Sequence, residues 1–245
     1  MSSKPLLSHK KMLFFDVVGT LVDPEASFQK SMEETFHDYT ARWDPDLKAA
    51  SLLKLYQDQM QQFMLQQRRK GSALPIYQLR MHCLRVALHK SKLPLDDSAK
   101  QHFIQQVWKE QRRWFTLYPE VHSTLQRLSK HYTLGIISNS HRFTLKQLGL
   151  DSCIDSKHVY TAKIAGSKKP NKLIFEYALK SAGLNPKQTV MIGDSKKNDV
   201  LGAHRAGMDA IWIHRNKKKK RAKPGDREHF VTIHTLDALT KKPFI

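Results

Sequence analysis

The chain has little cysteine and no long apolar run. Its 245 residues include two cysteines, Cys83 and Cys153, which are far apart, lack a C-x-x-C spacing and are too few for a disulfide scaffold, so we expect both to be reduced and buried. No apolar stretch approaches the roughly 20 residues that a membrane span needs, and the first five residues lack the apolar run of a secretory signal. We therefore expect a globular, cytoplasmic protein without a membrane span.

Acidic residues are also scarce relative to basic ones. The chain carries 42 Lys and Arg against 22 Asp and Glu, a formal net charge of +20, which favours anionic partners such as phosphates, nucleic acid or anionic lipid. A dense basic cluster occupies 215–223, just before a Pro-Gly turn signal. Because no aromatic residues are interleaved with its lysines as stacking platforms, we interpret this segment as a solvated loop, with weak polyanion binding as the alternative.

Short apolar runs alternate with helical patterns in most of the chain. This alternation predicts a parallel, doubly wound sheet of the Rossmann-like α/β class. The predicted strands are 11–18, 133–137, 189–192, 210–213 and, at the sheet edge, 230–233. The predicted helices between them are 120–130, 141–149, 171–183 and 198–207.

The segment from about 26 to 111 has no strand-like runs. It is rich in Gln, Lys, Leu and Met at helical spacing, and its apolar stripe, from Leu52 to Met64, is typical of helix-packing core. The candidate helices are 27–42, 47–70, 75–90 and 96–113. We therefore predict an inserted all-helical domain, 25–113, within a catalytic core made of 1–24 and 114–245.

The first chemical motif follows the first predicted strand. Asp16 ends that apolar run and is followed by Gly19, which allows a tight turn, and by Thr20, whose hydroxyl is suited to hold the loop or a substrate oxygen. A carboxylate at a strand end of an open α/β sheet is placed to act as a nucleophile and form a covalent intermediate. The alternative is that Asp16 only caps a turn.

The second motif is Ser138-Asn139, directly after the strand predicted at 133–137. A hydroxyl and backbone N–H groups at a strand end that leads into a helix suit an anionic substrate oxygen. We predict both residues as substrate-binding, against the alternative that they form an ordinary helix cap.

The third motif is the segment 166–170, which contains Lys168, Lys169 and Pro170. An ammonium group near a carboxylate nucleophile would neutralise charge on the nucleophile and on a phosphate during attack. We predict Lys169 in this role, anchored by Pro170 at the first helical position, with Lys168 as its rival.

The fourth motif carries two carboxylates five residues apart, Asp194 and Asp199, after the strand predicted at 189–192. With Asp16 facing them from the adjacent strand, they predict an all-oxygen site of the kind that Mg²⁺ prefers. A purely structural interpretation, in which both acids cap a helix, accounts for Asp199 at best.

In this order and spacing the motifs resemble those of the haloacid dehalogenase superfamily, in its branch with a helical cap inserted after the first strand. The resemblance covers nearly the whole chain, through segments 12–21, 25–113, 134–139, 166–170 and 191–208. It implies a Rossmann-like core with a cap that selects the substrate.

The resemblance also implies roles for the motif residues. Asp16 would attack a phosphoryl group, and Mg²⁺ would be held by Asp16, Asp194 and the main-chain carbonyl of Val18. Ser138 and Lys169 would bind the transferring phosphoryl oxygens. Asp199 would support the metal site.

Val18 departs from the pattern of the family's phosphatases, which carry an Asp there to protonate the leaving alkoxide and then activate water. General acid-base help of this kind is typically worth about 100 to 10,000-fold, and valine cannot transfer a proton. His141, beyond Ser138-Asn139, is a candidate substitute acid with a suitable intrinsic pKa. Its neighbour Arg142 is a candidate for binding substrate anions.

Three functions remain open at this point. The first is a Mg²⁺-dependent hydrolase that acts on a small phosphorylated metabolite through an aspartyl-phosphate intermediate. The second is a haloacid dehalogenase-type or a phosphonate-cleaving hydrolase, the latter with Lys54 as the cap lysine; Asp194 argues against dehalogenation because the family's dehalogenases replace that carboxylate. The third is a weakly catalytic or non-catalytic protein that binds polyanions.

Overall fold

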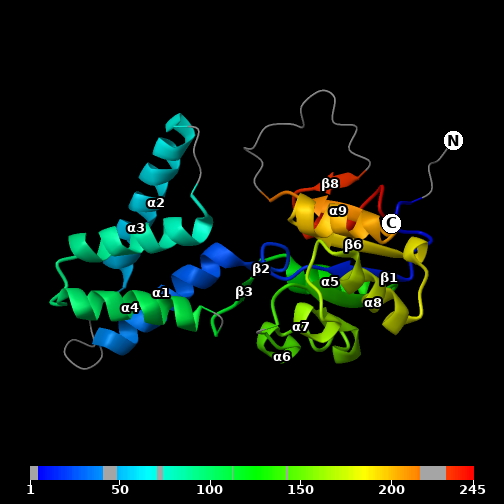
Figure 1. Ribbon diagram of the computed structural model, residues 1–245, viewed down its shortest axis with the longest axis horizontal. Helices are drawn as coiled ribbons and strands as arrows, with labels where there is room; N and C mark the ends of the chain where they lie inside the picture. The colour runs from blue at the N-terminus through cyan, green and yellow to red at the C-terminus, as the bar shows by residue number, and fades with distance from the viewer. Residues whose placement is uncertain (1–4, 41–48, 71–73, 112, 142, 216–229) are drawn as a thin grey trace. The chain divides into compact units, whose positions relative to one another are not determined.

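The computed structural model describes residues 5–40, 49–111, 113–141, 143–215 and 230–245, apart from 71–73. The chain divides into two compact units (Figure 1). One consists of Met1–Pro24 and Thr116–Ile245, and the other of Glu25–Phe115. The predicted basic loop lies outside the described residues, except for Arg215.

The first unit is built around a six-stranded parallel sheet with the order β5-β4-β1-β6-β7-β8, which confirms the predicted fold class. The strands are β1 (Met12–Phe15), β4 (Thr133–Ser138), β5 (Val159–Thr161), β6 (Thr189–Gly193), β7 (Asp209–Ile213) and β8 (Val231–Ile233). The chain runs outward from β1 through β4 to β5 and then returns to β6 on the other side of β1. The strand order therefore reverses at β1, where open α/β sheets bind their ligands.

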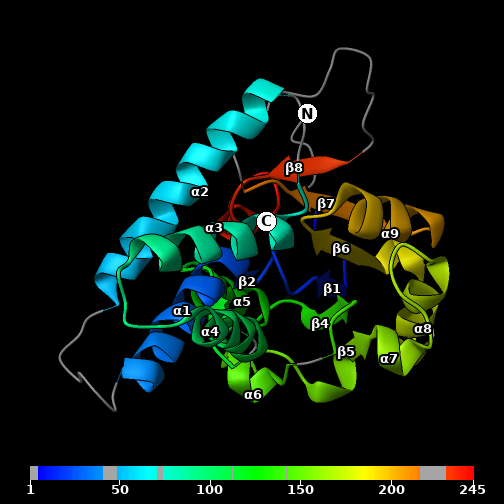
Figure 2. The ribbon, with the colours of Figure 1, turned by 60° about the vertical axis from the view of Figure 1, so that its left-hand side comes forward.

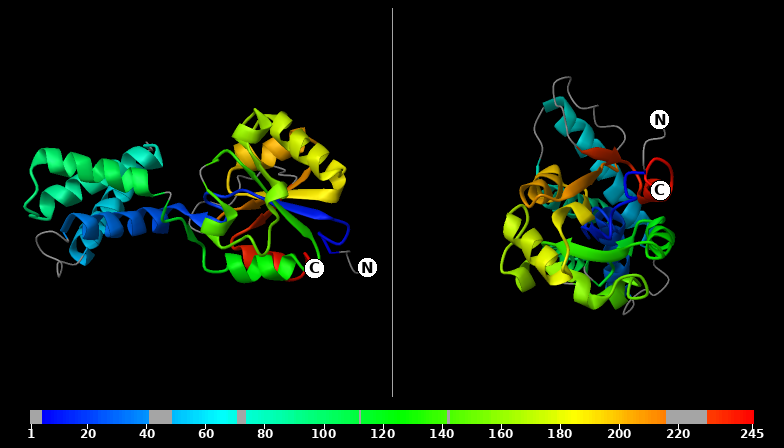
Figure 3. Two further views of the ribbon diagram at one scale, coloured as in Figure 1. Left: turned by 90° about the horizontal axis from the view of Figure 1, so that it is seen from below. Right: turned by 90° about the vertical axis from the view of Figure 1, so that its right-hand side faces the viewer.

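Helices cover both faces of this sheet, as the left view of Figure 3 shows. The helices α8 (Lys172–Ala182) and α9 (Leu201–Arg205), in yellow and orange, lie on one face, and α5 (Val121–Leu128), in green, lies on the other beside the red η4 (Leu236–Thr240). The side chains of Met12 and Phe14 pack toward α8 and α9 in a buried core. The shorter elements are α6 (Leu145–Leu148), α7 (Ala162–Ala165), η1 (Ser156–His158), η2 (Pro186–Gln188) and the π-helical turn η3 (Lys196–Val200).

Local capping chemistry explains where the sequence-based boundaries were wrong. The helix expected at 141–149 is the short α6, because the Thr144 side chain caps its start and Gly149, at φ +65°, ends it. The helix α8 begins at Lys172 with Asn171 as its N-cap, so Pro170 precedes the helix instead of opening it. Three strands were not predicted: the edge strand β5, and β2 (Val22–Asp23) and β3 (Thr116–Leu117), which form an antiparallel pair.

The second unit is all-helical (Figure 2). Its helices are α1 (Pro24–Thr40), α2 (Ala50–Lys70), α3 (Ile76–Lys90) and α4 (Asp97–Glu110). All four contribute to one apolar core, to which the predicted stripe on α2 gives the buried Leu52 and Tyr56, while Met64 is exposed. Within the core, Glu25 accepts hydrogen bonds from Arg80 and from the Tyr56 hydroxyl, at 3.0 and 3.1 Å.

Both cysteines are free thiols. Cys83 is buried in the helical core, and burial, reinforced by the charge of Glu25, raises the pKa of its thiol to about 11. Cys153 is half-buried, so the expectation of burial was correct for Cys83 alone. Among the described residues, no helix combines the length and the apolar character needed to cross a membrane.

Candidate active site

Polar side chains gather where β1, β4 and β6 end side by side. Asp16 directly follows β1, Ser138 ends β4, and Asp194 directly follows β6. Because β1 pairs in parallel with both neighbours, these three strand ends meet at one edge of the sheet. They line a cavity of about 350 Å³ together with Val18, Asn139, Ser140, Lys169, Ser195, Asn198 and Asp199.

Three carboxylates converge in this cavity. Asp16, Asp194 and Asp199 each present an oxygen, and these oxygens all lie within 4.8 Å of one another. Burial and the charges of Asp16 and Asp199 raise the pKa of Asp194 to about 7. Burial likewise raises the pKa of Asp199 to about 6, although Lys169 favours its charged form. The site therefore holds more negative charge than its own cation neutralises.

The cation is Lys169, which is 3% exposed. Its Nζ donates to Asp16 Oδ1 at 2.7 Å, to Asp199 Oδ1 at 2.6 Å and to the main-chain carbonyl of Ile137 at 2.8 Å. Burial alone would lower the pKa of this ammonium, but Asp16 and Asp199 raise it above its ordinary value. The rival Lys168 is exposed and does not line the cavity.

Asn139 positions the segment that carries this lysine. Its Oδ1 accepts from the Lys169 main-chain N–H at 2.7 Å, and its Nδ2 donates to the Lys169 carbonyl at 3.1 Å. The neighbouring Ser138 is buried, and its hydroxyl oxygen accepts from the Ser140 N–H at 3.1 Å. Ser138 and Asn139, the residues of the second motif, thus both line the cavity. The oxygen and the nitrogen of the Asn139 amide are each already hydrogen-bonded to the protein.

Two glycines allow the carboxylates to approach the backbone closely. A Cβ on Gly19, which has φ +91°, would lie 2.5 Å from Asp194 Oδ2. A Cβ on Gly193 would lie 2.3 Å from the carboxyl carbon of Asp199, whose Oδ2 accepts from the Ser195 N–H at 2.9 Å. Each contact is too short for any side chain, so both positions require glycine.

The donor set fits a hard divalent cation. All three converging groups are carboxylates, which are the ligands that Mg²⁺ prefers over softer metals. Burial first, and then the charge of neighbouring carboxylates, raises the pKa values of Asp194 and Asp199, and a bound cation would favour their charged forms. Among the described residues, this is the one group of three or more metal-ligating side chains within reach of a single ion.

Other predicted residues lie outside the cavity. Thr20 is fully buried and does not line the cavity, and its hydroxyl has no hydrogen-bond partner among the described residues. His141 is exposed and does not line the cavity either, so it is not placed to replace the missing acid; Arg142 lies outside the described residues. Val18 does line the cavity, and the residue is 41% exposed.

Two supporting residues were not found by sequence reasoning. The indole N–H of Trp212 donates to the main-chain carbonyl of Asp194 at 2.8 Å. Arg215 donates to the Thr20 carbonyl at 2.6 Å and to Glu120 at 2.7 Å. The sequence does place Trp212 on the strand that follows the fourth motif, which could have indicated this contact. Arg215 was interpreted only as part of the basic cluster 215–223.

An α/β sheet with a carboxylate at the end of its central strand, a buried lysine and two further carboxylates defines a hydrolase-type class of protein. A family model described as haloacid dehalogenase-like hydrolase matches residues 13–213. The chain therefore belongs to the haloacid dehalogenase-like hydrolase family.

Relatives in this family include proteins named as phosphatases. A glyceraldehyde 3-phosphate phosphatase from Methanothermobacter thermautotrophicus is 43% identical over 103 residues, which are 39% of this chain and 44% of that protein. The N-acylneuraminate-9-phosphatase of Homo sapiens is 24% identical over 86% of this chain and 85% of its own length. The chain thus matches less than half the length of the more identical of these two relatives.

Solved structures share the whole fold. YfnB from Bacillus subtilis, a HAD-hydrolase, superposes with a TM-score of 0.60 at 19% identity, covering 94% of this chain and 96% of YfnB. The 2-haloacid dehalogenase of Pseudomonas syringae pv. Tomato superposes with a TM-score of 0.57 at 26% identity and the same coverage. Both the α/β core and the helical unit therefore have counterparts in these structures.

Proposed function

We propose that the protein is a divalent-metal-dependent phosphomonoester hydrolase that acts through a phosphorylated Asp16. The observation that carries this proposal is the buried Lys169, whose Nζ joins Asp16 to Asp199 while Asp194 lies within reach of the same ion site. An ammonium and a cation site around one strand-end carboxylate suit the charge of a phosphoryl group. Relatives named as phosphatases support the same reaction class.

Asp16 is the proposed nucleophile. Because Lys169 occupies its Oδ1, we assign the attack on phosphorus to Oδ2. The new bond from Asp16 to phosphorus forms as the ester bond breaks, and water then hydrolyses the aspartyl phosphate to release phosphate and regenerate the carboxylate. Ser138 and Lys169 are proposed to bind the phosphoryl oxygens.

The metal site is proposed to consist of Asp16, Asp194 and the main-chain carbonyl of Val18, with Asp199 in support. Bound Mg²⁺ would supply electrostatic stabilisation of the phosphoryl charge. Asp199 is held by Lys169 and by the Ser195 N–H, so its main contribution is to fix the position of the lysine. Trp212 fixes the main chain of Asp194.

The leaving group defines the substrate class. Val18 stands at the cavity wall and has no proton to give, and no histidine lines the cavity among the described residues. Because Lys169 is held by Asp16 and Asp199, and Asp194 is assigned to the metal site, we assign the proton of the alkoxide to water. We infer a preference for small phosphorylated metabolites whose leaving group is stabilised, as in aryl or acyl phosphates.

The two alternative hydrolase functions are less well supported. Dehalogenation needs no cation, whereas Asp194 and Asp199 lie close enough to Asp16 to hold a metal ion with it. Carbon–phosphorus cleavage would use Lys54, which is an exposed residue of α2. A polyanion-binding role would rest on the 215–223 run, of which Arg215, the described member, is bound to Glu120 and Thr20.

The test is hydrolysis of p-nitrophenyl phosphate with and without Mg²⁺. We expect phosphate release that depends on the metal and disappears in Asp16→Asn, with the exposed Asp151→Asn as the control that keeps activity. Turnover of 2-chloropropionate in place of the ester would favour dehalogenation. No turnover together with salt-sensitive RNA binding would favour the polyanion-binding protein.

A further inference from the structure

Trp212 acts on the carboxylate cavity from outside its lining. The residue lies on β7, where it pairs with Gly193, the last residue of β6, so it stands beside the point at which the chain leaves the sheet for Asp194. Its indole N–H donates to the main-chain carbonyl of Asp194 at 2.8 Å. Because an indole has one donor and no acceptor, this bond fixes the direction in which that carbonyl points.

The peptide group that accepts this bond is held at its other end as well. Its carbonyl belongs to Asp194 and accepts from Trp212, while its N–H belongs to Ser195 and donates to Asp199 Oδ2 at 2.9 Å. A peptide group is planar, so an indole that fixes the carbonyl also fixes the opposite N–H. The two hydrogen bonds also polarise each other through the group that they share. Through one peptide, Trp212 therefore positions two of the three converging carboxylates, Asp194 and Asp199.

The indole ring is itself held by its neighbours. The His214 ring stacks on it, with 4.4 Å between centroids and 10° between planes, and the Phe230 ring lies nearly perpendicular to it at 6.2 Å. The Lys196 ammonium lies 4.3 Å from the indole centroid, within the range of a cation–π contact. These contacts use the rings and not the indole N–H, so a substitution can remove the hydrogen bond while an aromatic ring remains in place.

The exact placement of the carboxylates matters for a cation. Asp16, Asp194 and Asp199 bring oxygens to within 4.8 Å of one another, and like charges at this separation repel one another unless the chain holds them. Mg²⁺ requires a nearly ideal octahedral set of ligands, so a small displacement of one ligand lowers its affinity. Groups that orient metal ligands from outside are typically worth about 10 to 100-fold in metal affinity.

We propose that Trp212 is a positioning residue that sets the affinity of the carboxylate site for its divalent cation. This role rests on the metal site of the proposed function and adds the residue that holds two of its carboxylates in place. Lys169 contacts Asp16 directly at 2.7 Å, so the nucleophile keeps its ammonium partner when the indole N–H is removed. Loss of the N–H should therefore weaken metal binding, and an excess of metal should restore activity.

The test is a titration of the full chain with Mn²⁺, in which the EPR signal of the free ion reports binding without turnover. Mn²⁺ takes the same kinds of oxygen ligand as Mg²⁺. Trp212→Phe, which keeps an aromatic ring but removes the donor, should raise the Kd for Mn²⁺ by about 10 to 100-fold. Trp108→Phe, the same change at an exposed position of α4, should leave the Kd unchanged. Equal Kd values for Trp212→Phe and wild type would overturn the proposal.

A second replacement separates the N–H from the packing of the ring. 3-Benzothienylalanine at position 212 has a sulfur where the indole has its N–H and keeps both rings, so it preserves the contacts with His214, Phe230 and Lys196. The Kd for Mn²⁺ should rise as it does in Trp212→Phe. An unchanged Kd would show that ring packing, and not the hydrogen bond to Asp194, acts on the site, and would overturn the proposal.

Hydrolysis of p-nitrophenyl phosphate at increasing Mg²⁺ concentration separates positioning from structural support. Trp212→Phe should need about 10 to 100-fold more Mg²⁺ for its half-maximal rate and should reach a kcat close to that of wild type at saturation. A kcat that stays low at saturating Mg²⁺ would assign Trp212 to the support of the fold and overturn the proposal. If wild type binds no Mn²⁺, the metal site of the proposed function is wrong and the role of Trp212 is lost with it, which is a different result from equal Kd values.

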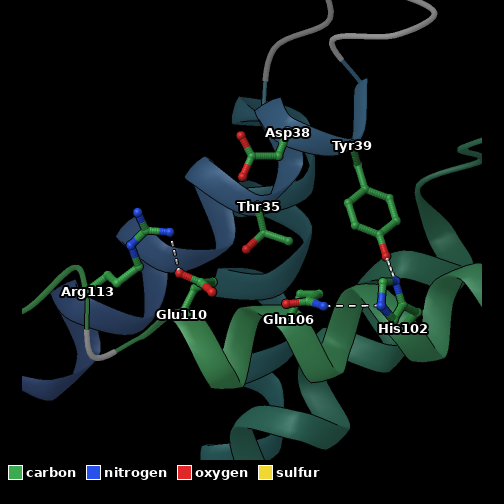
Figure 4. Close-up of a pocket in the computed structure, with 7 residues that line it drawn as sticks. All are labelled: Thr35, Asp38, Tyr39, His102, Gln106, Glu110 and Arg113. Atoms are coloured by element: carbon green, nitrogen blue, oxygen red, sulfur yellow. Dashed lines mark hydrogen bonds and ion pairs between the residues drawn. The ribbon is translucent and has the colours of Figure 1, made fainter. Parts of the chain in front are cut away.

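The helical unit supplies the control for where the ion binds. A pocket between α1 and α4 is lined by the carboxylates of Asp38 and Glu110, and Glu110 is paired with Arg113 at 3.2 Å (Figure 4). Within the part of the chain that the structure describes, this pocket does not bring three metal-ligating groups within reach of one ion. Asp38→Asn should therefore keep the Kd for Mn²⁺, whereas Asp194→Asn should abolish tight binding. The opposite pattern would place the ion in the helical unit and overturn the proposal.

Discussion

Asn139 and Lys169 are joined by two hydrogen bonds that run in opposite directions between one amide side chain and one residue's main chain. The pair connects the end of β4 to the segment before α8, 30 residues later. The lysine that neutralises Asp16 is thus positioned by a residue that sequence reasoning had assigned to the substrate.

Replacing Asn139 with Ala should lower turnover more than it changes substrate binding. The variant loses both main-chain bonds, and a displacement of about 1 Å near the reacting groups costs on the order of 100-fold in rate. We expect kcat for p-nitrophenyl phosphate to fall about 10 to 100-fold, with a smaller change in KM. Asn185→Ala, which removes a capping asparagine before β6, is the control. If KM changes instead of kcat, Asn139 binds substrate directly.

Replacing Lys169 with Met should abolish activity and destabilise the fold. The change leaves the carboxylates of Asp16 and Asp199 buried without their shared cation, and breaking a buried ion pair from one side costs about 3–5 kcal/mol. Urea unfolding of the variant measures this loss. Lys168→Met, one residue away on the exposed side, should be neutral in both measurements. A stable Lys169→Met variant would mean that the carboxylates are not both charged in the folded protein.

Much of this site could be predicted from the sequence because its parts are local. Asp16, Ser138 and Asp194 each follow an apolar run that forms a strand, and parallel strands end at the same edge of a sheet. The choice of Lys169 over Lys168 could not be derived in this way, since two adjacent lysines carry the same local signal. Burial and three hydrogen bonds, which depend on the tertiary structure, separate them.

Long-range partners explain the remaining differences. The strand β5 has three residues, too few to show a period, and it forms because β4 offers a free edge. The contact of Trp212 with Asp194 follows from the pairing of β6 with β7, which no local pattern encodes.

Arg215 should make stability depend on pH in the acidic range. It donates to Glu120 and to the Thr20 carbonyl and lies over the Tyr118 ring, 3.4 Å from its centroid. Burial, the largest single effect, would raise the pKa of Glu120. The hydrogen bond and charge of Arg215, together with main-chain N–H groups that include that of Leu236, outweigh burial and lower the pKa below the ordinary value of 4.5.

The lowered pKa of Glu120 determines how stability changes with pH. A carboxylate with a depressed pKa in the folded state contributes stability that is present above pH 4.5 and is lost as the pH falls through the folded pKa. Arg215→Gln should therefore lose about 1–3 kcal/mol at pH 7 and less below pH 4, as measured by urea unfolding at both values. An equal loss at both pH values would show that Arg215 acts through packing on Tyr118 and not through the charge of Glu120.

Replacing Val18 with Asp should restore the missing proton transfer. Val18 lines the cavity around Asp16 and is 41% exposed, so a carboxylate there stays hydrated and carries no large burial cost. General acid catalysis matters most for leaving groups that are poor as anions, where it is worth about 100 to 10,000-fold. We expect a large gain in kcat for an alkyl phosphate such as glycerol phosphate and little gain for p-nitrophenyl phosphate, whose leaving group needs no proton.

Val18→Asn, which has the same shape as the aspartate but no acid, is the matched control and should gain nothing on either substrate. If Val18→Asp and wild type hydrolyse the alkyl ester at the same rate, another group already supplies the proton and the inferred restriction to stabilised leaving groups is wrong.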